Sequence, residues 1–135
     1  MNIAFNTSSR FTILAALLFA VFCVPALPAA DEAASDGTPV GIIPVPDKLA
    51  IADVKACVSR AFINRKYQIQ KSEQGLIVGY YERSPNVLTL TVRYDTKEVK
   101  LFAKGSSRGG GLPTRWIESY RKDVGSFLSQ KLLEK

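Results

Sequence analysis

Residues 87–94 read VLTLTVRY and form the clearest strand pattern in the chain. Every second residue is apolar or aromatic, which is the period of a β-strand that buries one face. The positions expected to point inward are Leu88, Leu90, Val92 and Tyr94. The four residues 95–98 then predict a turn, and residues 99–104 a partner strand. Such a short connection requires the two strands to be antiparallel.

Two more strands are expected upstream of this hairpin. Residues 76–83 are rich in β-branched and aromatic side chains, and in residues 67–70 an apolar residue alternates with glutamine. The turns fall at 72–75 and 84–86, where Gly75 and Pro85 lie. Because all connections are short, the sequence predicts an antiparallel meander of four strands, with three strands as the alternative.

A helix is expected on each side of the meander. Residues 48–65 carry apolar side chains at three- and four-residue spacing, and Asp47 is the expected cap. Residues 114–133 repeat the pattern, with Gly125 as a point of expected close packing. Two amphipathic helices can cover one face of the sheet. The predicted fold is therefore a two-layer α+β domain with both helices on the same face.

The first 30 residues have the order of a secretory signal peptide. A polar start that includes Arg10 precedes the apolar run 11–24, and small residues follow at 25–30. Cleavage after Ala26, Ala29 or Ala30 fits this pattern. Residues 31–46 are then expected to be a flexible acidic leader, and residues 47–135 a single domain. Within the leader, the apolar run 40–45 suggests docking onto the domain.

Several classes of chemistry are excluded by composition. The chain has no histidine, so it cannot form a Ser-His-Asp or Cys-His catalytic site or a histidine-ligated metal site. Of its two cysteines, Cys23 lies in the signal segment and is expected to leave with it. Cys57 then has no partner for an intramolecular disulfide. Its place on the apolar face of the first helix predicts a buried thiol, with a reactive or dimerising thiol as the alternative.

Charge is distributed unevenly. The whole chain has a net charge of +6, yet residues 48–135 contain 17 basic and 8 acidic side chains, a net charge of +9. A strongly basic domain attracts anionic partners at long range. For an exported protein of a Gram-negative bacterium, periplasmic or envelope-associated, these are lipid head groups, lipopolysaccharide or acidic polymers. Nucleic acid is an unlikely partner outside the cytoplasm.

The order of these elements resembles a group of small exported proteobacterial envelope proteins of unknown function, some of them lipid-anchored. Over residues 48–135 the shared features are a helix ending in basic residues, Tyr-x-Ile at 67–69, Leu-x-Val-x-Tyr at 90–94, and spaced aromatic and aliphatic residues from Trp116 to Leu128. Tyr120 stands where that group has tryptophan. The resemblance implies a helix–meander–helix fold and an envelope location, and it brings no catalytic residues.

The candidate binding residues follow from the predicted sheet. If the apolar positions of 87–94 face the helices, the opposite face carries basic and aromatic side chains. The strand expected at residues 76–83 contributes Tyr81 and Arg83 to that face if its odd positions point outward. The glycine-rich loop 105–111 adds Arg108. The candidate anion- or partner-binding residues are Tyr81, Arg83, Arg93, Lys100, Phe102, Lys104 and Arg108. The alternatives are an ordinary solvated face, or one covered by residues 40–45 or by a second subunit.

No pattern predicts a catalytic, cofactor or metal site. The acidic residues are scattered, and the chain lacks nucleotide-binding loops and calcium loops. The sequence therefore predicts a non-enzymatic binding module for an anionic envelope component or partner. The alternative is an accessory or inhibitor protein that acts through protein–protein contacts in envelope assembly or stress.

Overall fold

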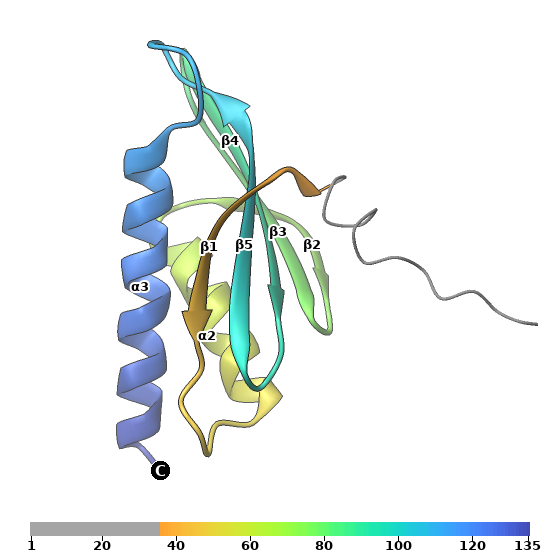
Figure 1. Ribbon diagram of the computed structural model, residues 1–135, viewed down its shortest axis with the longest axis vertical. Coiled ribbons are helices and arrows are strands. Elements are labelled where there is room, and N and C mark those ends of the chain that lie inside the picture. The colour runs from red at the N-terminus through yellow and green to blue at the C-terminus, as the bar shows by residue number, and fades with distance from the viewer. Residues whose placement is uncertain (1–35) are drawn as a thin grey trace, which may run out of the picture.

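The computed structural model describes residues 36–135, which form an α+β fold of five strands and two helices (Figure 1). The elements are β1 (Thr38–Pro44), α2 (Ile51–Asn64), β2 (Gln68–Glu73), β3 (Leu76–Arg83), β4 (Asn86–Tyr94), β5 (Glu98–Ser106) and α3 (Thr114–Leu133). The expected signal segment 1–30 lies outside the described residues. No helix of residues 36–135 is long and apolar enough to cross a membrane.

All strand pairs are antiparallel, in the order β1-β5-β4-β3-β2. The alternation in β4 has the predicted sense, because its four apolar positions are buried against the helices. Figure 1 shows α2 behind the sheet and α3 running beside the β1 edge. The other face of the sheet, which we call the outer face, carries no helix of the described chain.

The fifth strand is the main departure from the expected fold. Residues 38–44, expected within a flexible leader, form β1 and pair with the free edge of β5. Val45 continues this contact, since its N–H donates to the carbonyl of Lys97 at 2.9 Å. The expected docking of residues 40–45 is thus realised as a strand. Two prolines and a glycine among seven residues conceal its β-strand pattern.

The core lies between the sheet and the two helices. Phe62 of α2 is fully buried against Gly79 of β3, where an added Cβ would lie 2.4 Å from the phenylalanine ring. Tyr120 of α3 packs on the same ring, with centroids 4.5 Å apart. Cys57 is buried and unpaired, as predicted. A Cβ added to Gly125 would have no atom of the described chain within 4 Å, so the expectation of close packing there is wrong.

Both ends of α2 differ from what the sequence alone suggests. Asp47 is not the cap; the N-cap is Ala50, whose N–H donates to Asp53 Oδ2 at 2.9 Å. At the other end Lys66 adopts φ +62°. The N–H of Lys66 donates to the carbonyl of Ile63, and the N–H of Tyr67 donates to the carbonyl of Phe62. This is a Schellman motif, which favours glycine at the position that Lys66 occupies. The left-handed conformation costs a non-glycine residue about 1–2 kcal/mol.

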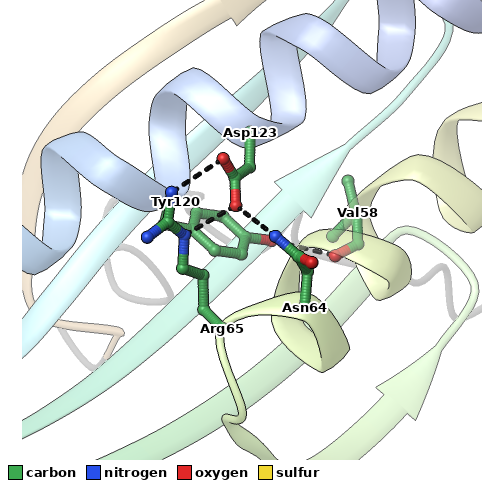
Figure 2. A network of polar contacts seen from close by, with 5 residues as sticks. All are labelled: Val58, Asn64, Arg65, Tyr120 and Asp123. Carbon is green, nitrogen blue, oxygen red and sulfur yellow. Dashed lines mark hydrogen bonds and ion pairs between the residues drawn. The ribbon is translucent and has the colours of Figure 1, made fainter.

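The two helices are joined by a polar network (Figure 2). Arg65 binds both carboxylate oxygens of Asp123, with Nε to Oδ2 at 2.7 Å and Nη2 to Oδ1 at 3.0 Å. The side-chain amide of Asn64 donates to the same carboxylate at 2.9 Å. Deeper in the interface, the hydroxyl of Tyr120 donates to the carbonyl of Val58 at 3.1 Å. The C-terminal end of α2 is therefore fixed to the middle of α3.

Candidate anion-binding site

Four of the seven candidate residues lie on the outer face, as the strand alternation predicts. Arg93 pairs with Lys100 across β4 and β5, and Thr91 pairs with Phe102. Lys104 lies further along β5, opposite Thr89. Residues directly opposite in an antiparallel pair share a face, so the register places basic and aromatic side chains together.

The centre of this face is less available than the sequence suggests. Arg93 Nε forms an ion pair with Asp36 Oδ2 at 2.5 Å, and Lys100 Nζ lies 3.3 Å from Glu98 Oε1. Phe102 is only 7 % exposed. Acidic neighbours thus already neutralise two of the expected cations, and the aromatic ring is not open for stacking.

Tyr81 lies on the other face, which corrects the conditional expectation for the second strand. The register of β3 and β4 pairs Tyr81 with Leu88 and Gly79 with Leu90, both of which face the helices. The odd positions of β3 therefore point inward, because Gly79 must accommodate Phe62. Arg83, two residues beyond Tyr81, is exposed where the strand runs past the core.

The two remaining candidates, Arg83 and Arg108, belong to segments that adjoin at one end of the sheet, where the β3–β4 turn lies beside the glycine-rich loop. The backbone N–H of Arg108 donates to Asn86 Oδ1 at 2.8 Å and so holds this loop against the turn. Lys104 lies on the outer face of β5 near the same end, with its side chain beside Gly37. Arg115, which no sequence pattern singled out, follows in the first turn of α3. We call Arg83, Lys104, Arg108 and Arg115 the basic end.

The basic end has little compensating negative charge. All four of its cations are exposed, and none forms an ion pair within residues 36–135. Glu82 is the acidic residue beside Arg83; the hydroxyl of Tyr80 donates to it at 2.9 Å, and this hydrogen bond raises the pKa of Tyr80. The local charge is therefore clearly positive.

The start of α3 adds to this positive potential. Its first turn contains no acidic residue, and no side chain of the described chain caps its free N–H groups. The positive end of a helix dipole carries about half an elementary charge. Because Arg108 and Arg115 lie close to this helix end and form no ion pair within residues 36–135, the dipole strengthens the attraction of an anion to this end of the molecule.

The glycine-rich loop itself is largely closed on its own backbone. Ser107 N–H donates to the Gly111 carbonyl and Gly110 N–H to the Ser107 carbonyl, both at 2.9 Å. Gly110 and Gly111 have φ values of +88° and +73°, which explains the need for glycine there. Since these amides are occupied, the loop contributes to the basic end mainly through the side chain of Arg108.

Comparisons with known proteins give no relative. No family model, no curated protein and no solved structure matches the chain. Among residues 36–135 no group of three or more cysteine, aspartate or glutamate side chains is placed to hold a metal ion. Function must therefore be inferred from the surfaces of this molecule alone.

Proposed function

We propose that the protein is a non-enzymatic binding module that holds an anionic component of the bacterial envelope at its basic end. The observation that supports this most directly is that Arg83 and Arg108 lie on adjoining segments at one end of the sheet and Lys104 lies near that end of β5, each exposed and without an ion pair within the described chain.

The geometry suits a large anion more than a small one. The cations come from two strands, a loop and the first turn of α3, so they are spread and do not converge on one point. Such an arrangement attracts a surface or polymer with many negative charges, and each basic side chain near an anionic lipid surface contributes about 1 kcal/mol. Binding of this kind weakens as salt screens the charges.

The cellular location is part of the proposal. The signal-like order of residues 1–30 favours export, and the partners available outside the cytoplasm are anionic lipid head groups, lipopolysaccharide phosphates and acidic polymers. We place the protein in the periplasm or at the envelope of a Gram-negative bacterium. On this view nucleic acid is not the partner.

A charge-reversal pair tests the proposal. The variant R83E/K104E/R108E is compared with K55E/K97E/K122E, which makes the same change of net charge at exposed lysines elsewhere. Binding of the processed chain to vesicles with and without anionic lipid, to lipopolysaccharide and to an acidic polysaccharide is measured at low and high salt. The first variant should lose roughly 100-fold in affinity for the anionic target. The second should lose much less; equal losses would mean that net charge, not the basic end, controls binding.

A second candidate function is that of an accessory or inhibitor protein acting through protein contacts. The observation in its favour is β2, an edge strand exposed along its whole length with Ile69 among its residues. An unpaired edge can accept a strand from a partner. Capture of an envelope protein that survives high salt and is lost in Ile69→Lys supports this function over anion binding.

A further inference from the structure

A pocket of about 270 Å³ lies on the helix side of the sheet, and none of the four basic-end residues is among those that line it. Three separate segments form it: the end of α2 and the residues that follow it, β3, and the first turns of α3. Its lining residues are Asn64, Arg65, Lys66, Tyr67, Tyr81, Trp116 and Ser119. This volume is below the range of about 300–1,000 Å³ that holds drug-sized ligands, so the pocket fits a single ring with its substituents.

Aromatic rings form one side of the pocket. The Tyr81 ring stands edge-on to Trp116, with centroids 4.7 Å apart and planes at 78°, and its other neighbour is Tyr67 at 5.3 Å. Such faces provide apolar contact to a flat or puckered ring. The side chains of Trp116 and Tyr81 are half-buried, so part of each ring surface remains accessible to a ligand in the pocket.

The opposite side is polar and held in place. Arg65 and Asn64 both bond the carboxylate of Asp123 (Figure 2). This carboxylate accepts three hydrogen bonds, and Asp123 is not one of the residues that line the pocket. None of the seven lining residues is acidic.

The lining is instead rich in unused donors. Within residues 36–135 no hydrogen bond or ion pair engages the Lys66 ammonium, the Trp116 indole N–H, or the hydroxyls of Tyr81 and Ser119. Tyr67 is only 7 % exposed, and its hydroxyl is a buried polar group without a partner in this part of the chain. Buried polar groups are normally hydrogen-bonded. A pocket that offers several donors and no acidic acceptor is complementary to a ligand rich in acceptors.

Lys66 supplies the charge. It occupies the left-handed position of the Schellman motif, where glycine is preferred for the backbone. Glycine there would leave the pocket without its unpaired cation, whereas lysine places an ammonium at the mouth. Arg65 is already paired with Asp123, so Lys66 is the cation left to meet a ligand anion.

We propose that this pocket is a second binding site, which takes a small ring-shaped anion: one five- or six-membered ring that carries a carboxylate or a phosphate. The ring lies against Tyr81 and Trp116, and the anionic group is held by Lys66 with hydroxyl and indole donors beside it. An acidic or phosphorylated sugar and an aromatic acid share this chemistry.

Trp116 is the single tryptophan of the chain, so its fluorescence reports on the pocket directly. The protein is titrated with three charged and neutral pairs: glucuronate and glucose, glucose 6-phosphate and glucose, and benzoate and benzyl alcohol. At least one anion should bind about tenfold or more tightly than its neutral partner, and the pair that does so identifies the kind of ring. Equal binding of charged and neutral rings, or no binding of any anion at about 10 mM, overturns the proposal.

Two glycine variants separate the ligand role of Lys66 from its backbone role. Lys66 and Lys48 both have positive φ, at +62° and +81°, so Lys66→Gly and Lys48→Gly each relieve a left-handed lysine. Lys66→Gly should lose roughly tenfold in affinity for the charged ring without loss of thermal stability. Lys48→Gly should bind as the unchanged protein does; an equal effect of the two variants rules out the role of Lys66. The variant K104E/R108E, which leaves Arg83 beside Tyr81 unchanged, should keep ring binding, so this site and the proposed function of the basic end can fail independently.

Discussion

Arg65 and Asp123 form a bidentate ion pair across 58 residues of sequence, from the C-cap of α2 to the middle of α3. Asn64 adds a third donor to the same carboxylate. Bidentate arginine–carboxylate pairs have a defined geometry, so this contact fixes how the end of α2 sits on α3. Figure 2 shows this contact. Its two donor residues, Asn64 and Arg65, also line the pocket.

The variant Asp123→Asn should lower the free energy of unfolding at pH 7 by about 1–2 kcal/mol, after allowance for solvent screening of the partly exposed Arg65. Hydrogen bonds from Arg65, and then from Asn64, lower the pKa of Asp123 below its ordinary value of 3.8. The ionised carboxylate of Asp123 therefore stabilises the folded protein at pH values above 3.8, the ordinary pKa. This stabilisation is lost as the pH falls through the lower pKa of the folded protein. Urea unfolding at several pH values measures this.

The control for this prediction is Glu118→Gln, which removes an exposed pair with Arg121 within α3. Pairs of this kind contribute about 0.3–0.5 kcal/mol. If Asp123→Asn has no larger effect than Glu118→Gln at pH 7, or if its effect does not shrink in acid, the Arg65 contact does not stabilise the helix interface.

Gly79 and Gly125 should respond in opposite directions to alanine. A Cβ on Gly79 lies 2.4 Å from the buried Phe62 ring, so Gly79→Ala should destabilise by about 1–3 kcal/mol or more. Gly125 is inside α3 with open space around it, so Gly125→Ala should stabilise by about 0.5–1 kcal/mol. Melting temperatures of the two variants check the prediction, and a loss of stability in Gly125→Ala would contradict it.

Most of the fold was predictable because its elements carry strong local patterns. β4 alternates without interruption, and α2 and α3 have continuous apolar stripes, so the existence of these elements and the side that each buries agree with expectation, whereas the start of α2 does not. β1 was not predictable in the same way. Its prolines and its irregular register between Pro39 and Gly41 remove the period-two signal, and its stability comes from pairing with β5, which lies far along the chain.

The candidate site shows the same division. Strand alternation placed Arg93, Lys100 and Lys104 on the outer face correctly. The side of Tyr81 depends on Gly79 meeting Phe62, a contact between distant segments that no local pattern contains. The pocket likewise joins residues 64–67, 81 and 116–119, and the one local signal was the run of a basic pair and a tyrosine directly after a helix.

Cys57 should react slowly with thiol reagents in the folded protein. Desolvation raises the pKa of its thiol above the ordinary value of 9.0, so the reactive thiolate is scarcer at a given pH, and the side chain is buried between the helices and the sheet. Labelling with a disulfide reagent at pH 8 should be at least about tenfold slower than in urea. Fast labelling of the folded chain would mean that α2 opens readily.

Tyr67 and Tyr120 provide a matched pair of hydroxyl deletions. Tyr120→Phe removes the 3.1 Å hydrogen bond to the Val58 carbonyl and should destabilise by about 1 kcal/mol. Tyr67→Phe removes a buried hydroxyl that has no partner within residues 36–135, so it should leave the free energy of unfolding unchanged or raise it by about 1 kcal/mol. Both rings keep their aromatic contacts, with centroids 5.9 Å apart. Urea unfolding under the same conditions measures the free energy of unfolding of both variants. An equal loss of stability in both would show that the Tyr67 hydroxyl is hydrogen-bonded in the free protein.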